Sequence, residues 1–173
     1  MKIANIESET DPAAALLDYR DAIQRMNALP EESRKALPNQ RILANMLSKN
    51  GLALKEVGKY QEALSYLEQA KAIDRPYLTA DPNDTRAGND LLAILENEAQ
   101  CFEDRAQAVF AQERTDRSAD AVNALKSLSE ARSLTEHLSQ VEPDNLFLQS
   151  TLGLLLIRIS QQQRALHPKS RVN

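Results

Sequence analysis

The chain has 173 residues and a formal net charge of -4, with few glycines, prolines and aromatic residues. Helix-forming residues dominate, while the β-branched and aromatic residues that favour strands are scarce, so we expect an all-α protein. The acidic balance argues against a nucleic-acid surface or an anionic-membrane surface, because such surfaces concentrate Lys and Arg. The single cysteine, Cys101, excludes an intramolecular disulfide and a thiolate-based zinc site.

Six helices are expected, from the spacing of apolar residues and from the prolines and capping residues near their starts. In chain order they cover about residues 12–28, 38–57, 60–75, 83–112, 117–140 and 144–165. A turn at Gly58 joins the second helix to the third. The stretch before residue 115 contains neither Gly nor Pro, so we expect an extended fourth helix and a polar turn near residues 115–118.

An internal repeat runs through these helices. Alanines seven residues apart, with apolar residues between them, recur at 15–22, 63–70 and 124–131. A proline follows each block and a leucine stands nine residues beyond it, giving the pairs Pro38 and Leu47, Pro82 and Leu91, and Pro143 and Leu152. The Asp and Asn residues close to these prolines are expected to cap the helices that begin there, namely Asn39, Asp81 and Asn83, and Asp144 and Asn145. The agreement of the three registers predicts stacked helix pairs that bury a continuous core.

Residues 44–77 form the clearest unit of this repeat. Gly, Tyr and Ala residues stand at fixed offsets in it, at Gly51, Gly58, Tyr60, Ala63 and Ala70. This spacing resembles the tetratricopeptide repeat (TPR), a 34-residue pair of antiparallel helices called A and B. The unit departs from the family at Asn50, where a large apolar residue is usual, and at Pro76, which falls one residue late. The resemblance implies a short TPR-like α-solenoid of antiparallel helix pairs, a fold that binds other proteins far more often than it catalyses reactions.

We expect a single TPR-like domain over residues 1–173. Its units are a partial repeat at about 12–37, repeats at 38–76 and 82–140, and a closing helix at 143–165. Because the chain starts on a B-type helix and ends on an A-type helix, either it is a fragment of a longer array or its end helices act as caps. The connector at residues 72–94 carries a second likeness, which covers about residues 40–95, to the longer repeats that follow kinase domains in some bacterial serine/threonine kinases. That likeness implies a module of a bacterial signalling or regulatory protein.

No constellation of catalytic or metal-binding residues is apparent in the sequence. His137 and His167 lie far apart without converging ligands, and we expect Cys101 to be an ordinary buried residue. Four carboxylates crowd the fourth helix: Glu96, Glu98, Glu103 and Asp104. We expect a solvated acidic face there rather than a metal cluster. The sequence therefore predicts no enzyme activity, no metal and no cofactor.

The terminal and apolar segments bear on location. The N-terminus lacks the continuous apolar segment of a secretory signal, and the longest apolar stretch, residues 152–157, is far shorter than a membrane span. We therefore expect a cytoplasmic protein with no membrane partner.

Candidate binding residues follow from the resemblance, because A helices line the concave groove of TPR domains. Carried over by register, the partner-binding positions are Asn45, Ser48, Leu52, Lys55, Asn89 and Glu96, with further groove positions at Glu56, Leu92, Ala99, Ser150, Gly153, Ile157 and Ser160. Some family members clamp a partner's C-terminal carboxylate with Lys and Asn, but Ser48 and Leu52 stand at those positions here, so that ligand is not expected. We expect a non-catalytic module that binds a peptide or partner protein. The alternative is a self-associating structural domain that forms a homodimer through its terminal helices.

Overall fold

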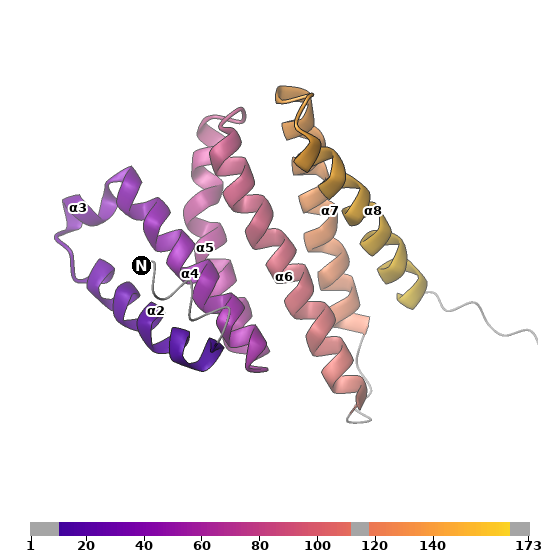
Figure 1. Cartoon of the computed structure of the whole chain (residues 1–173), viewed down its shortest axis with the longest axis horizontal. Coiled ribbons are helices and arrows are strands. Elements are labelled where there is room, and N and C mark those ends of the chain that lie inside the picture. Colours follow the sequence, from indigo (N-terminus) through magenta and orange to yellow (C-terminus); the bar gives the residue numbers. More distant parts are fainter. Residues whose placement is uncertain (1–10, 112–117, 167–173) are drawn as a thin grey trace, which may run out of the picture. The chain divides into compact units, whose positions relative to one another are not determined.

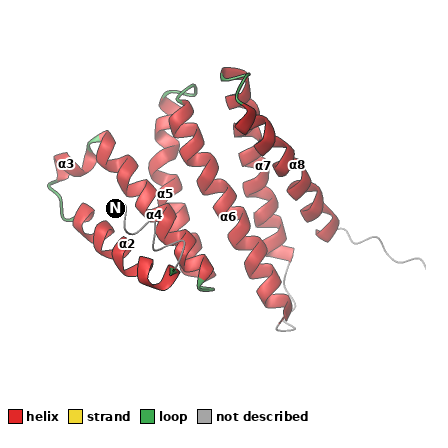
Figure 2. Cartoon of the chain, viewed as in Figure 1, coloured by secondary structure: helices red, strands yellow, loops and turns green. Residues whose placement is uncertain are grey.

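The computed structural model describes residues 11–111 and 118–166. Every regular element in these ranges is a helix, which confirms the all-α prediction (Figure 2). The helices are α2 (Pro12–Asn27), α3 (Glu31–Lys35), α4 (Leu37–Glu56), α5 (Tyr60–Ala80), α6 (Thr85–Ala111), α7 (Ser118–Val141) and α8 (Leu146–Leu166). They divide between two compact units, Met1–Pro82 with α2 to α5 and Asn83–Asn173 with α6 to α8 (Figure 1).

All of these helices except α3 lie where the sequence predicts a helix, with small differences at most ends. The larger difference is in α5, which continues through Pro76 to Ala80 instead of ending near residue 75. Proline lacks an N–H, so the helix forgoes one hydrogen bond there, yet it does not end. The short helix α3 is a finding that the sequence pattern did not predict. Its acidic start and basic end, from Glu31 to Lys35, suit the helix dipole.

In the first unit, α4 packs against both α2 and α5. Helices α4 and α5 form an antiparallel pair, and the turn between them contains Gly58, whose φ of 76° favours glycine. The two helices approach closely at Gly51, where an added Cβ would lie 3.0 Å from Leu67 Cγ and 3.1 Å from the carbonyl oxygen of Ala63. The two glycines singled out in the sequence therefore serve different purposes, close packing at Gly51 and the turn at Gly58.

In the second unit, α7 packs against both α6 and α8 (Figure 1). Contacts between α6 and α7 join residues whose numbers have a nearly constant sum: Gly88 with Leu138, Glu98 with Ser127, and Arg105 with Asp120. Such a series is the signature of an antiparallel pair. The predicted polar turn between these helices falls largely on residues 112–117, which lie outside the described residues, while Ser118 already belongs to α7.

Side-chain caps mark the starts of three helices. Asp11, Asp84 and Asn145 accept hydrogen bonds from backbone N–H groups in the first turns of α2, α6 and α8. Asn145 is a cap that the sequence predicts, whereas Asp84 is not. The prediction is wrong for Asn39, which donates its side-chain amide to a carbonyl of α3 and leaves α4 without a side-chain cap.

Candidate binding surfaces

Four of the predicted binding residues share one face of α4. Asn45, Ser48, Leu52 and Lys55 stand at i, i+3, i+7 and i+10, the spacing that aligns side chains along a helix. Asn45 is exposed, Ser48 and Leu52 are half-buried, and the ammonium of Lys55 lies 3.1 Å from a carboxylate oxygen of Glu56. The Lys55 side chain is only 12% exposed, so its charge is held against the helix rather than extended into solvent. The face combines an amide, a hydroxyl, an aliphatic chain and a charge pair.

The groove positions that the repeat pattern assigns to α6 agree only partly with the structure. Asn89 and Glu96 are partly exposed and lie two turns apart on one face. Leu92 and Ala99, which the same register assigns to the groove, are almost fully buried. The prediction is wrong for these two positions, because they are core residues of the folded chain. The buried side-chain oxygen of Asn89 has no hydrogen-bond partner among the described residues.

A polar cluster joins α6 to α8 beside Glu96. The guanidinium of Arg158 donates to Glu103 at 2.8 Å and lies 3.4 Å from the side-chain oxygen of Gln100. Gln162 donates to the second oxygen of Glu103 at 3.0 Å. Burial raises the pKa of Glu96 from its ordinary value of 4.5, and the positive charge of Arg158 offsets only part of that effect. The cluster therefore holds α8 to the same side of α6 that carries Glu96.

The carboxylates of α6 do not form the solvated acidic face that the sequence predicts. Glu98 is buried and accepts a hydrogen bond of 2.8 Å from the hydroxyl of Ser127 in α7. Glu103 accepts hydrogen bonds from Arg158 and Gln162 of α8. Both of these carboxylates accept a hydrogen bond from another helix, and the residue pattern along α6 alone does not reveal such contacts. The expectation of a solvated face is therefore wrong for Glu98 and Glu103.

A second charged pair, between α6 and α7, was not singled out in the sequence. Both oxygens of Asp120 accept hydrogen bonds from Arg105, at 3.0 Å from Nε and 2.5 Å from Nη2. Such a two-pronged arrangement fixes the relative position of two helices more tightly than a single contact. The hydrogen bond to Asp120 also raises the pKa of Arg105. No sequence pattern pointed to this pair, because Arg105 and Asp120 lie 15 residues apart on different helices and meet only through the packing of those helices.

Two of the three residues weighed for catalysis, Cys101 and His137, lie on different helices of the described chain. Cys101 is fully buried, as predicted, and His137 is half-buried in α7, while His167 lies outside the described residues. Among residues 11–111 and 118–166, no three His, Cys, Asp or Glu side chains gather in a way that could hold a metal ion. None of the helices in those ranges is both long and apolar enough to cross a membrane.

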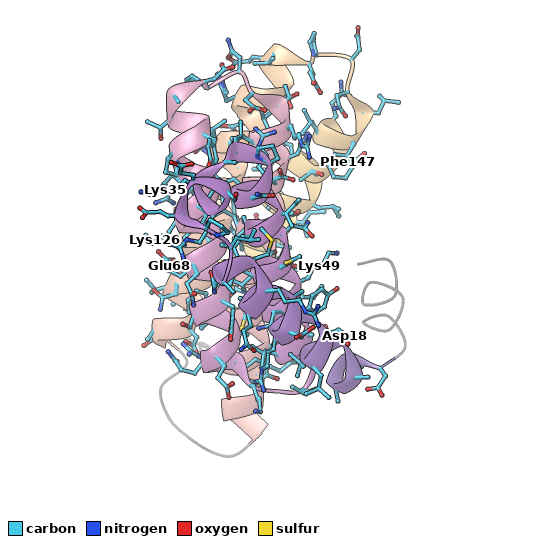
Figure 3. All side chains as sticks on the ribbon, turned by 90° about the vertical axis from the view of Figure 1, so that its left-hand side faces the viewer. Asp18, Lys35, Lys49, Glu68, Lys126 and Phe147 are labelled. Carbon is cyan, nitrogen blue, oxygen red and sulfur yellow. The ribbon has the colours of Figure 1, made fainter. Side chains whose placement is uncertain are left out.

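The most apolar exposed surface of the described chain lies on α8. Five large apolar side chains on this helix are between 45% and 73% exposed: Leu146, Phe147, Leu154, Leu156 and Ile157. Figure 3 labels Phe147 among the side chains of the molecule. The groove positions predicted for this helix, Ser150, Gly153 and Ile157, lie on the same exposed side, with Ser160 partly covered. We call this surface the α8 face.

The chain was compared with protein-family models, with curated proteins and with solved structures. No family model matches it, and no curated protein or solved structure matches it significantly.

Proposed function

We propose that this chain is a non-catalytic protein-interaction module, a TPR-like scaffold that binds a peptide or partner protein along its A-type helices. The observation that carries the proposal is the face of α4 formed by Asn45, Ser48, Leu52 and Lys55. These side chains lie roughly opposite the buried side of α4, which carries Leu47 and Leu54. They offer hydrogen-bonding groups beside an aliphatic chain, a combination suited to an extended or helical peptide.

The arrangement of the A-type helices supports this proposal. Both α6 and α8 pack antiparallel to α7, so they run in the same direction, as successive A helices of a TPR array do. The internal repeat assigns the same type to α4. We also propose a cytoplasmic location, as expected from the sequence. A bacterial signalling context is proposed as well, because residues 72–94 are similar to repeats that accompany kinase domains.

The test is selection of peptides from a random display library on the immobilised full chain, followed by binding measurements with two matched variants. Ser48→Glu places a longer charged side chain on the proposed face of α4. Ser65→Glu makes the same change at an exposed position of α5. We expect the selected peptides to bind wild type and Ser65→Glu alike, and to bind Ser48→Glu at least about tenfold more weakly.

Circular dichroism of both variants checks that the helical fold is kept. If the library yields no binding peptide, or if Ser48→Glu binds the selected peptides as well as Ser65→Glu does, the α4 face is not the binding surface.

A further inference from the structure

The α8 face differs from every other exposed surface of the described chain in being broad, apolar and uncharged. Among the described side chains, each other helix exposes at most two large apolar residues. From Leu146 to Gln163 the only charged residue is Arg158, and its guanidinium is engaged with Glu103 of α6. An apolar patch of this kind on a folded protein marks a surface that another molecule covers.

Gly153 gives a second, independent observation at the centre of this face. The chain has two other glycines inside helices, and both allow a neighbouring helix to approach. An added Cβ at Gly51 would lie 3.0 Å from Leu67 Cγ, and one at Gly88 would lie 2.7 Å from Leu138 Cδ2. An added Cβ at Gly153 would meet nothing within 4 Å. Glycine weakens a helix interior, and no contact within the described chain accounts for it at this position.

We infer that the α8 face binds a second copy of this chain, with the two α8 helices antiparallel about a two-fold axis that crosses them at the level of Leu155, whose own side chain lies buried on the opposite side of the helix. In that register Gly153 of each copy faces Ile157 of the other. A large aliphatic side chain would then enter the space above a glycine, as Leu67 does at Gly51 and Leu138 does at Gly88. A two-fold interface requires a patch that complements itself, and this pairing of a small with a large residue occurs twice by symmetry.

Charge favours a copy of the chain as the occupant. A neutral apolar face is matched by another neutral apolar face, and the α8 face is the surface of that kind found among the described residues. Two copies meet there without opposing like charges. At the ends of the contact Leu146 of one copy lies opposite Arg164 of the other, whose aliphatic stem can cover the leucine while its charge stays in water. This inference does not rest on the proposed peptide-binding role of α4, and it assigns the predicted groove positions Ser150, Gly153 and Ile157 of α8 to the contact between copies instead of to a peptide.

The test is the mass of the full chain in solution over a micromolar concentration series, by light scattering and sedimentation equilibrium. Two variants put a carboxylate at β-branched residues of similar exposure in the same unit: Ile157→Asp on α8, from a residue 57% exposed, and Val122→Asp on α7, from a residue 53% exposed. We expect wild type and Val122→Asp to form dimers with similar dissociation constants. Ile157→Asp should weaken the dimer at least about a hundredfold, because it buries an unpaired charge.

A third variant tests the predicted register. Gly153→Leu fills the space that Ile157 of the other copy needs, so we expect it to weaken the dimer while the dilute monomer unfolds at the same or a higher temperature. The inference is overturned if wild type stays monomeric throughout the series, or if Ile157→Asp dimerises as well as Val122→Asp. Dimerisation of Gly153→Leu as tight as that of wild type would overturn the pairing of Gly153 with Ile157.

Discussion

At the scale of single residues, the glycines inside helices are of two kinds: packing within the chain requires a glycine at Gly51 but not at Gly153. Gly51→Ala is expected to destabilise the monomer by about 1–2 kcal/mol, because the new methyl group meets the backbone carbonyl of Ala63 and the branch point of Leu67. Gly153→Ala is expected to stabilise it by about 0.5–1 kcal/mol, because the space there is open and alanine favours a helix. Urea unfolding of both variants in dilute protein measures the two effects. Effects of the same sign would contradict the prediction.

The alanines of the repeat make a second prediction at this scale. Ala63 and Ala70 are fully buried in α5, so Ala63→Leu or Ala70→Leu should overpack the unit and destabilise it by about 1–3 kcal/mol. Ala72→Leu is the matched control, since Ala72 is exposed on the same helix. Its change should remain within about 0.5 kcal/mol. If both buried variants unfold at the temperature of wild type, the repeat assignment of α5 is wrong.

These residues show what a sequence reveals well. Small residues required by close packing repeat at fixed spacing, so Gly51, Ala63 and Ala70 could be found without a structure. Asn50 could only be noted as a departure from the family. In the structure its side chain is fully buried, and neither of its polar atoms has a hydrogen-bond partner among the described residues. Whether a polar side chain is buried depends on neighbours from other helices, which spacing along one helix does not reveal.

At the scale of helices, the cluster between α6 and α8 makes stability depend on pH through Glu96. Burial raises the pKa of Glu96 above 4.5, so the folded chain holds this proton more tightly than the unfolded chain does. Stability therefore falls as pH rises through the window above 4.5, and the cost is fully present once pH exceeds the raised value. Glu96→Gln removes this cost. We expect it to raise the melting temperature at pH 7 by about 1–3 °C, since solvent screens a half-buried group.

The pH profile distinguishes this cause from a general effect of losing a charge. The advantage of Glu96→Gln over wild type should shrink as pH falls from the raised pKa toward 4.5, and it should be lost below 4.5, where the wild-type carboxyl is protonated in both states. Glu32→Gln, at an exposed position of α3, should show no such advantage at pH 7. An advantage for Glu96→Gln that is equal at all pH values would contradict the proposed role of its ionisation.

Helix positions were predicted well, while contacts between helices were predicted poorly. Apolar spacing and prolines placed α2, α4 and α6 to within a few residues, because these signals are local. The links of Glu98 to Ser127 and of Glu103 to Arg158 join residues 29 and 55 positions apart. They depend on which side of α6 each neighbouring helix covers. The expectation of a solvated acidic face on α6 is therefore wrong for Glu98 and Glu103.

At the scale of the whole molecule, the division into Met1–Pro82 and Asn83–Asn173 predicts that a part of the chain can fold by itself. The fragment of residues 83–173 contains α6, α7 and α8 together with the links described between them, among them Glu98 with Ser127, Arg105 with Asp120, and Glu103 with Arg158. It also contains the close approach of Leu138 to Gly88. We expect the fragment to show strong helical circular dichroism and a cooperative thermal transition.

A destabilising substitution in the fragment tests whether its stability comes from the helix contacts seen in the structure. Asp120→Ala removes the two-pronged partner of Arg105, and we expect it to lower the stability of the isolated fragment by about 2–4 kcal/mol, because the guanidinium is left partly buried without that carboxylate. Asp144→Ala, at an exposed position before α8, is the control and should change little. A fragment that is unfolded, or that melts without cooperativity and responds alike to both substitutions, would show that residues 83–173 do not form an independent folding unit. A cooperative transition that shifts only with Asp120→Ala would mean that the helix contacts within this unit suffice to specify its fold.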